Sequence, residues 1–253
     1  MSVGVNHQES STGLTAVMPV YNEIDLCEFA LRRLHKFLTD HFPDFEIIVI
    51  ESGSSDGTAE VVDRLAQELI NMQVIHETVR NGMGAAIRLG YAHASKPYIF
   101  LVTADIPFPL ETLIRAVPLL NQHDCVLSFR DEDSRSFLRK LQSAAYVQLI
   151  KKTLGLRMKS VNSAFKLIPT DFVQSLELVS TAWFLDAEIL YWISEKGLRY
   201  AEIPVPLIER TAGISKVGFA GWAITIGELI NFKKKCANLN QNLNDSGGKS
   251  WKI

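Results

Sequence analysis

Short apolar runs alternate with longer amphipathic segments through most of the chain, and this alternation limits the fold more than any other feature of the sequence. Strands that are apolar through most of their length are typical of a sheet covered on both faces. The amphipathic segments between them supply the crossover helices of a parallel sheet. The sequence therefore predicts an α/β protein, a Rossmann-like three-layer α/β/α sandwich with a mostly parallel sheet. The expected strands are Thr15–Val20, Glu46–Ile50, Gln73–Glu77, Tyr98–Val102 and Cys125–Phe129.

Local signals mark the helix boundaries. Asp56 stands before Gly57 and Thr58 and can cap a helix start, and Pro97 ends the helix before the fourth strand. The helices expected between the strands are approximately Ile24–Leu38, Thr58–Leu69, Gly84–Ala94 and Leu110–Leu120. Further along, the pattern predicts a helix around Phe137–Thr153, a strand near Ser163–Ile168, a helix around Asp186–Lys196 and a strand near Tyr200–Ile208.

Composition excludes several classes of protein. A chain of 253 residues commonly forms one α/β domain, and a formal net charge of -2 gives no support to nucleic-acid binding. The odd number of cysteines, Cys27, Cys125 and Cys236, suits neither a disulfide framework nor a metal site, so we expect reduced, partly buried thiols. The histidines show no metal-ligand spacing.

The segment before the C-terminal tail has a distinct character. Residues 217–232 are apolar apart from Glu228, and three lysines follow at once, Lys233 to Lys235. This run is too short to span a bilayer. An amphipathic helix whose lysines reach anionic lipid headgroups is one interpretation, and a helix packed on the core is the other.

Chemically suggestive residues follow the predicted strands. In open parallel sheets, ligands bind outside the carboxyl ends of the strands. The segments that follow the strands are Pro19–Glu23, Glu51–Gly57, Arg80–Gly84, Asp105 and Arg130. We therefore expect one binding site, at one edge of the sheet.

Two of these loops suit a nucleotide. The acceptor-rich loop from Glu51 to Asp56 can bind a nucleobase and ribose, or it can be a turn and a helix cap without a ligand. The glycine-rich segment Asn81–Gly84 opens a helix and can approach a diphosphate, or it simply turns the chain. It is not a Walker A loop, because no Lys-Ser or Lys-Thr pair follows. Arg88, one turn later, is either a further contact or a solvated helix residue.

Other residues are candidates for charge recognition. Asp105 can meet Mg²⁺ or Mn²⁺ on a nucleotide diphosphate, or it is a turn residue. Arg130, Arg139 and Ser143 can converge on a second anion, because arginine offers a planar fork of donors. Arg210 and Lys216 flank a glycine turn and can wrap a phosphate, the alternative being a plain basic loop. Asp186 and Glu188 lie in the first turn of a predicted helix, where the helix dipole favours negative charge. One of them can face an active site, or both can simply cap the helix.

In this order, the segments resemble the family 2 glycosyltransferases of the GT-A fold. The likeness is greatest to dolichyl-phosphate mannosyl- and glucosyltransferases and their bacterial undecaprenyl-phosphate relatives, and it runs from about Leu14 to Lys216. The motifs that carry it are Pro19-Val-Tyr-Asn-Glu23, Ser54-Ser-Asp56-Gly-Thr58, Arg80 to Gly90, Ser128-Phe-Arg130, Arg139-Lys-Leu-Gln-Ser143, Phe184-Leu-Asp186-Ala-Glu188, Glu202-Ile-Pro-Val205 and Arg210 to Lys216.

The chain departs from the family pattern at its acidic motifs. The acidic pair after the second strand is Glu51-Ser52 here, and the DAD triplet after the fourth is Thr103-Ala104-Asp105. The acidic block before the family's GF(K) segment reads Ser160 to Lys166 and contains no aspartate. Asp105 alone remains of the expected metal ligands.

The resemblance implies transfer of a hexose, with inversion, from a UDP- or GDP-sugar to a polyprenyl phosphate, with Mg²⁺ or Mn²⁺ as cofactor. It implies Asp105, Asp186 and Arg130 as catalytic residues and Arg130, Arg139 and Ser143 as binders of the acceptor phosphate. The nucleotide-sugar binders implied are Pro19, Tyr21, Glu23, Glu51, Ser54, Asp56, Gly82, Gly84, Ala104, Arg210 and Lys216.

Composition and the extent of the resemblance together divide the chain into a flexible N-terminal tail (1–12), a family 2 catalytic domain (13–216), an amphipathic helix suited to a membrane surface (217–236) and a disordered C-terminal tail (237–253). The resemblance implies an enzyme in the cytoplasm, peripheral on the cytosolic face of a membrane. Two alternatives remain open: a family 2 transferase with a soluble saccharide acceptor, and a non-catalytic relative that binds nucleotide sugars.

Overall fold

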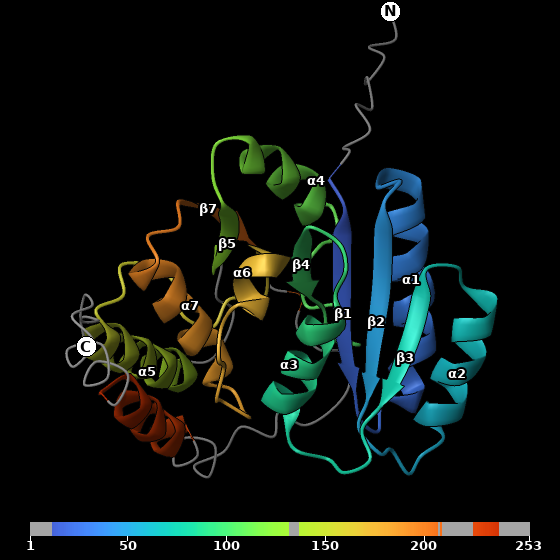
Figure 1. The fold of residues 1–253 in the computed structure, drawn as a ribbon, viewed down its shortest axis with the longest axis horizontal. Coiled ribbons are helices and arrows are strands. Elements are labelled where there is room, and N and C mark those ends of the chain that lie inside the picture. Colours follow the sequence, from blue (N-terminus) through green and yellow to red (C-terminus); the bar gives the residue numbers. More distant parts are fainter. Residues whose placement is uncertain (1–11, 132–136, 207, 209–224, 238–253) are drawn as a thin grey trace, which may run out of the picture.

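The computed structural model describes residues 12–131, 137–206, 208 and 225–237, and for residues 137–142 it describes the backbone only. A seven-stranded sheet organises this part of the chain, with the strand order β3-β2-β1-β4-β6-β5-β7 (Figure 1). The strands are β1 (Leu14–Val20), β2 (Phe45–Glu51), β3 (Met72–His76), β4 (Tyr98–Leu101), β5 (Cys125–Arg130), β6 (Lys166–Pro169) and β7 (Tyr200–Val205).

The sheet is parallel except at β6, which pairs antiparallel with β4 on one side and β5 on the other. The neighbouring pairs are parallel, with Leu14 opposite Phe45 in β1 and β2 and Cys125 opposite Tyr200 in β5 and β7. The expected strands are confirmed to within two residues at each end for the first five. The strand expected at Ser163–Ile168 begins three residues later, at Lys166.

The helices are α1 (Ile24–His41), α2 (Thr58–Glu68), α3 (Met83–His93), α4 (Thr112–Ala116), α5 (Phe137–Leu154), α6 (Thr170–Gln174) and α7 (Leu185–Glu195). A 3-10 helix, η1 (Val117–Asn121), follows α4 directly. The single helix expected at Leu110–Leu120 is therefore wrong, because Pro118 has no N–H for a continuing α-helix and the chain tightens at that point. The short helix α6 was not expected from the sequence.

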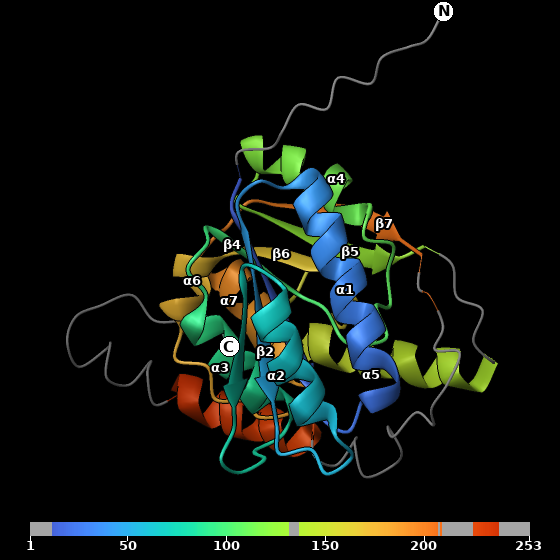
Figure 2. The same cartoon turned by 90° about the vertical axis from the view of Figure 1, so that its right-hand side faces the viewer.

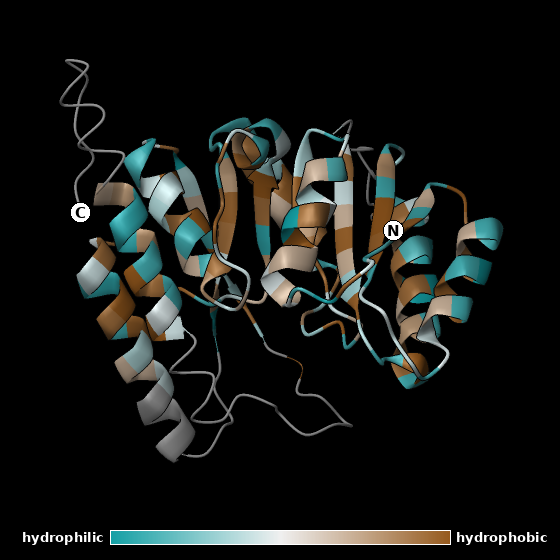
Figure 3. Ribbon diagram, turned by 60° about the horizontal axis from the view of Figure 1, so that its bottom comes forward, coloured by the Kyte–Doolittle hydropathy of each residue, from teal (hydrophilic) through white to brown (hydrophobic). Residues whose placement is uncertain are grey.

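Two apolar cores, one on each face of the sheet, make the three layers. One core joins the sheet to α1, α2 and α4, and includes Leu34 and Phe108. The other joins it to α3, α5, α6 and α7, and includes Ile87 and Tyr191. Figure 2 shows α1 and α3 on opposite sides of the sheet, and Figure 3 shows hydrophobic residues concentrated on the strands. The predicted three-layer sandwich with a mostly parallel sheet is confirmed.

A further helix, residues 225–237, packs against the second core. Phe232 is fully buried, and its ring contacts those of Phe184 and Tyr191 at centroid distances of 5.7 and 5.1 Å. Ile226 and Ile230 are 42% and 49% exposed. For residues 225–237, one face of the helix therefore packs on the core, which is one of the two interpretations, and its other face is exposed; residues 217–224 of the predicted segment lie outside the described residues. No helix among the described residues is long and apolar enough to cross a membrane.

The three cysteines are free and buried, as the sequence predicts.

Candidate functional site

The strands β1 to β5 and β7 all end at one edge of the sheet, because β6 alone runs the other way. We call it the carboxyl edge; it is the lower edge of β1, β2 and β3 in Figure 1. The predicted segments that follow β1, β2 and β3 begin at this edge. Asp105, which follows β4, and Arg130, which ends β5, also lie there. Lys166, the first residue of the reversed strand β6, lies at the same edge.

Hydrogen bonds join the loops after β1 and β2. Asn22 donates its N–H to Ser54 Oγ at 3.0 Å, and its Oδ1 accepts the N–H of Ser55 at 2.9 Å. Glu23 donates its N–H to Thr58 Oγ1 at 3.0 Å. Asn22 has a φ of 50°, in the left-handed region that asparagine tolerates. Two loops that are about thirty residues apart in the sequence are thus held as one surface.

Asp56 completes this connection. Its Oδ1 accepts both the N–H and the hydroxyl of Thr58, at 3.0 and 2.6 Å, and its Oδ2 accepts the N–H of Ile24 at 3.2 Å. Burial acts to raise the pKa of the Asp56 carboxyl, but the hydrogen bonds from Thr58 and Ile24 outweigh it and lower that pKa. Asp56 therefore links the starts of α1 and α2.

Glu51 is buried at the end of β2, with 3% of its surface exposed. Its oxygens accept the N–H groups of Gly53 and Ser54 at 3.2 and 2.6 Å, and His76 Nδ1 lies 3.1 Å away. Burial acts to raise the pKa of this carboxyl, but the hydrogen bonds from Ser54, His76 and Gly53 leave it lowered. The Glu51 carboxylate thus shapes the loop from within, while Ser54 stands at its surface.

The third loop, between β3 and α3, is tied to the first by a cation–π contact. The Arg80 guanidinium lies 3.8 Å from the centre of the Tyr21 ring. Gly82 and Gly84 approach the backbone of Thr181 and Ala182 so closely that an added Cβ would meet it at 2.6 Å in each case. Gly84 also donates its N–H to the Thr181 carbonyl at 2.9 Å. The glycines of this segment therefore serve a close approach of α3 to the chain before α7.

Asp105 stands in a tight turn after β4. Ile106 donates its N–H to the Thr103 carbonyl at 2.9 Å and has a φ of 39°, which is strained for a β-branched residue. The hydroxyl of Thr103 donates to Asp105 Oδ1. Ala104 is buried and Asp105 half-buried. The threonine that replaces the family's first acidic residue thus orients the remaining carboxylate.

A resident metal centre has little support among the described residues, since no three His, Cys, Asp or Glu side chains there are grouped to hold an ion. Asp105 fits a different arrangement. Mg²⁺ in nucleotide sites is commonly held by one or two carboxylates together with substrate phosphates and water. A single oriented carboxylate is compatible with an ion that arrives on a diphosphate.

The predicted acceptor-phosphate residues are placed unequally. Arg130 ends β5 at the carboxyl edge and is half-buried. Ser143 is half-buried in α5, and the side chain of Arg139 in the same helix lies outside the described residues. Arg210 and Lys216 also lie outside them. Ile208, just before that segment, donates its N–H to the carbonyl of Pro107 at 2.9 Å, beside the Asp105 turn.

The two carboxylates of α7 have different surroundings. Glu188 is fully buried and accepts the N–H groups of Val179 and Ser180, both at 2.9 Å, so it holds the chain before α7. Asp186 is 28% exposed, and its Oδ1 lies 2.9 Å from the ammonium of Lys166, which is 8% exposed. Of the pair, Asp186 alone is in a position to meet a ligand.

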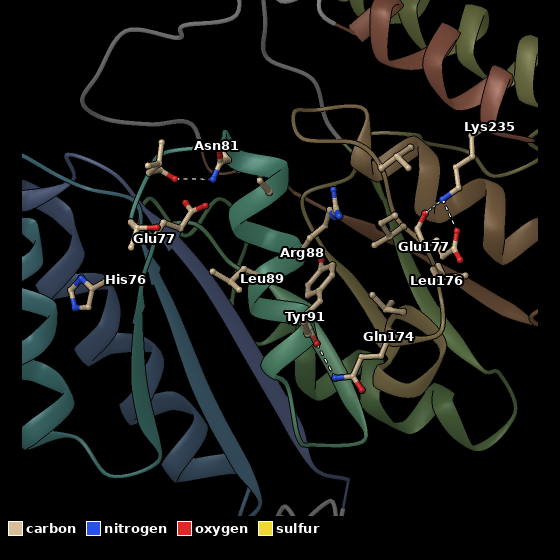
Figure 4. A pocket seen from close by; sticks show the side chains of 17 residues that line it. His76, Glu77, Asn81, Arg88, Leu89, Tyr91, Gln174, Leu176, Glu177 and Lys235 are labelled. Atoms are coloured by element: carbon tan, nitrogen blue, oxygen red, sulfur yellow. Dashed lines mark hydrogen bonds and ion pairs between the residues drawn. The ribbon is translucent and has the colours of Figure 1, made fainter.

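A groove of about 970 Å³ runs along the outer side of α3 (Figure 4). Arg88 extends into it from α3, and the ion pair of Lys235 with Glu177 lies across from it, at 3.3 Å. The loop after β3 contributes Asn81 at its end nearest the carboxyl edge. Arg88 is therefore a half-buried groove residue, and its two predicted roles, a ligand contact or a solvated helix residue, stay predictions.

Four residues of this region were not predicted as site residues from the sequence: Arg80, His76, Lys166 and Glu228. Glu228, on the helix 225–237, accepts the N–H groups of Thr181 and Ala182 at 2.7 and 2.8 Å. Its partners are more than forty residues away in the chain, so no local pattern indicates them. The sequence did indicate an ion pair at Lys166, because a lysine that begins an apolar strand and becomes buried needs a counter-charge.

Comparison with known proteins decides the family. The family model described as glycosyl transferase family 2 matches residues 15–174, well over half of the chain. The chain belongs to glycosyl transferase family 2. The resemblance stated from the motifs is confirmed, and with it the class of enzyme, a glycosyltransferase.

Curated relatives agree with this assignment. The chain is 26% identical to an undecaprenyl-phosphate mannosyltransferase of Micrococcus luteus, over 82% of this chain and 89% of that protein. It is 30% identical to an undecaprenyl-phosphate 4-deoxy-4-formamido-L-arabinose transferase of Salmonella choleraesuis, over 81% of this chain. The chain spans only 63% of the length of that second relative.

Solved structures at low identity show the same fold. A mannosyltransferase from Pyrobaculum calidifontis, in complex with GDP-Man and Mn²⁺, aligns with a TM-score of 0.62 at 20% identity, over 94% of this chain and 65% of that one. A mannosyl-3-phosphoglycerate synthase from Rubrobacter xylanophilus aligns with a TM-score of 0.66 at 16% identity, over 93% and 75%. The expected GT-A fold is confirmed.

Proposed function

We propose that this glycosyltransferase moves a hexose, with inversion, from a UDP- or GDP-sugar to a polyprenyl phosphate. One observation carries the proposal: the loops after β1 and β2 are hydrogen-bonded into one surface, at the edge of the sheet where Asp105 and Arg130 also stand. The names of the relatives support the acceptor, since both act on undecaprenyl phosphate. The complexes of fold relatives with GDP-Man or UDP support the donor class.

The reaction depends more on the alignment of the two substrates than on a strong base. A phosphate monoester is already an anion near neutral pH, and its oxygen can attack the anomeric carbon as the bond to the diphosphate breaks. That bond change in one displacement inverts the anomeric configuration. The protein's task is to hold the two anions in line and to stabilise charge on the departing diphosphate.

The residues divide between the two substrates. Ser54 and Tyr21, with Pro19 and Glu23 beside them, would hold the nucleoside on the joined loops, which Asp56 and Glu51 keep in shape. Gly82 and Gly84, which let α3 approach the chain before α7, and Ala104 would lie beside the diphosphate, and Arg210 and Lys216 would neutralise it. Arg130, Arg139 and Ser143 would bind the acceptor phosphate.

Asp105 would hold a divalent ion together with oxygens of the donor diphosphate. Mg²⁺ or Mn²⁺ at that place supplies charge neutralisation of the leaving group. The chain's own contribution is to keep the carboxylate oriented, through the Thr103 hydroxyl and the turn that Ile106 closes.

The outer face of the helix 225–237 suits an anionic membrane surface. Ile226 and Ile230 are exposed beside the exposed Lys233 and Lys234, which lie one to two turns further along the same face. Apolar side chains with flanking lysines are the composition that binds lipid headgroups. We therefore place the enzyme at the cytosolic face of a membrane and keep the division into a catalytic domain (13–216) and a surface helix (217–236) as part of the proposal.

An assay of nucleotide release tests the function. Purified protein is incubated with UDP- or GDP-sugars, with and without undecaprenyl or dolichyl phosphate, and with Mg²⁺, Mn²⁺ or a chelator. Release that needs both the lipid phosphate and a divalent ion is expected. Release with a soluble saccharide in place of the lipid would contradict the acceptor, and tight nucleotide binding without any release would indicate a non-catalytic relative.

Substitution at Asp105 links the assay to the site. Asp105→Ala is expected to reduce transfer by about a hundredfold or more, because the charge that holds the ion is lost. Glu111→Ala, a surface carboxylate that follows the same turn, is the matched control and should leave transfer unchanged. Turnover of Asp105→Ala at the wild-type rate would remove Asp105 from the mechanism.

A further inference from the structure

A buried lysine of the antiparallel strand β6, Lys166, lies beside the predicted catalytic carboxylate of Asp186. Lys166 opens β6, and its ammonium donates to the Ser163 carbonyl and lies beside Asp186 Oδ1, both at 2.9 Å. The lysine is 8% exposed and the aspartate 28%. The ammonium is therefore enclosed, whereas the carboxylate that it holds opens toward solvent.

The antiparallel direction of β6 places this lysine at the carboxyl edge. In a wholly parallel sheet, the first residue of a strand would lie at the opposite edge. Because β6 pairs antiparallel with both β4 and β5, Lys166 stands near the strand ends that lead to Asp105 and Arg130. The one reversed strand thus adds a positive charge to the edge where phosphates would bind.

Among the described residues, Lys166 is the one ion-pair partner of Asp186. The negative charge of Asp186 also acts on Tyr91 of α3 and Tyr146 of α5. Burial, followed by the negative charge of Asp186, raises the pKa of Tyr91, and burial raises the pKa of Tyr146 to about 12, again with a contribution from Asp186. The contact that can hold this carboxylate is therefore the ion pair with Lys166.

We propose that Lys166 is a positioning residue of the sugar-transfer site, which fixes the Asp186 carboxylate in one orientation toward the transferred sugar. The inference rests on the proposed function. Held in this way, the carboxylate accepts hydrogen bonds from sugar hydroxyls and faces the positive charge that develops at the anomeric carbon as the diphosphate leaves. The lysine itself does not need to touch the substrate.

The alternative is an ion pair that merely stabilises the core. Removing one partner of such a pair destabilises a protein, but it leaves kcat and KM of the protein that is still folded unchanged. The two roles therefore predict different outcomes for variants that are still folded.

The experiment uses Lys166→Met, Lys166→Arg and Asp186→Asn in the full chain. The readouts are kcat and KM for transfer of the sugar, measured separately, and the 13C chemical shift of the Asp186 carboxyl at pH 7. Without the ammonium, the carboxylate loses the partner that orients it, so that its chemical shift should change and kcat/KM at pH 7 should fall by about tenfold or more. Lys166→Arg keeps the charge and should restore kcat/KM.

Arg199→Met is the matched control. Arg199 pairs with Asp124 at 2.9 Å, the same distance, where β5 and β7 begin, at the other edge of the sheet. This variant should leave both readouts at wild-type values. The double variant Lys166→Met with Asp186→Asn should be no slower than Asp186→Asn alone, because the two residues act as a unit.

The outcomes separate this inference from the proposed function. Unchanged kcat/KM in a folded Lys166→Met protein overturns the inference, even if the wild-type enzyme transfers sugar to a polyprenyl phosphate. Wild-type protein that transfers nothing overturns the function, while the chemical shift of the Asp186 carboxyl still tests the pair. Should Lys166→Met not fold, an Asp186→Asn variant that is folded and transfers at the wild-type rate would equally overturn the inference.

Discussion

The carboxylate of Glu51 lies 3.1 Å from Nδ1 of His76, and Nε2 of the same ring lies 2.8 Å from Asp63. The imidazole thus bridges two carboxylates, one buried at the end of β2 and one on α2. Hydrogen bonding to Asp63 raises the pKa of His76, burial acts against this, and hydrogen bonding to Glu51 raises it further. The ring, held between these two carboxylates, supports the loop that is predicted to bind the nucleoside.

This bridge predicts a pH dependence of stability. The pKa of His76 is higher in the folded protein than its ordinary value, so its contribution is complete below that ordinary value and is lost as pH rises through the folded pKa. We expect wild type to exceed His76→Gln in free energy of unfolding near pH 5.5 and to lose that advantage by about pH 9. Since His76 is 45% exposed, the difference should stay below about 1 kcal/mol.

Urea denaturation at several pH values measures this difference. His93→Gln is the control, because the ring of His93 bonds the Leu89 carbonyl rather than a carboxylate. An advantage of wild type over His76→Gln that is the same at pH 5.5 and pH 9 would contradict the charged bridge.

Gly84 predicts a steric effect at the start of α3. A Cβ there would lie 2.6 to 2.7 Å from backbone atoms of Thr181 and Ala182, which cannot rotate away. Gly84→Ala should therefore destabilise the protein by about 1–3 kcal/mol and weaken nucleotide-sugar binding, although alanine is the better helix former. Thermal unfolding and calorimetric titration with UDP- and GDP-sugars measure the two effects.

Gly227→Ala is the matched control for Gly84. Gly227 also lies within a helix, and a Cβ at that position meets nothing within 4 Å. The substitution should stabilise the protein by up to about 1 kcal/mol. Equal effects of the two substitutions would show that packing against Thr181 does not constrain α3.

The sequence predicted the local elements of this fold better than their arrangement. The boundaries of β1 and β2 could be found because apolar runs and turn residues are local signals. The direction of β6 could not, because Lys166 to Pro169 are as apolar and short as a parallel strand would be. Which neighbours a strand pairs with depends on residues far away in the chain.

The candidate site shows the same limit. Motif order placed Asp56 and Asp105 at one edge correctly, because the carboxyl ends of parallel strands share an edge. Glu51 was predicted to contact the nucleotide, a role that stays a prediction, but its burial against His76, 25 residues away, was not foreseen. The roles of Glu228 and Lys166 likewise depend on tertiary contacts.

Asp56 predicts a coupling between stability and binding. Its carboxylate joins the start of α1 to the start of α2 through Ile24 and Thr58. Asp56→Ala leaves those donors without an acceptor and should cost about 1–2 kcal/mol, together with a loss of nucleotide affinity. Ser55→Ala, at the exposed neighbour bonded through its backbone N–H, is the control and should change little. Unaltered nucleotide affinity in a folded Asp56→Ala protein would show that the joined loops are not the nucleoside site.

The two faces of the helix 225–237 are expected to have separate roles, one in the stability of the fold and one in membrane binding. Phe232 is fully buried, whereas Ile230 on the other face is 49% exposed. Phe232→Ala should reduce the free energy of unfolding by about 3–5 kcal/mol, because it empties a packed aromatic cluster. Ile230→Ala should change stability by less than about 0.5 kcal/mol.

Flotation with vesicles of anionic and of neutral lipid tests the membrane-binding role of the exposed face. Ile230→Asp should lose binding to the anionic vesicles while remaining as stable as Ile230→Ala. Binding of Ile230→Asp at the wild-type level would mean that this face of the helix does not meet the membrane.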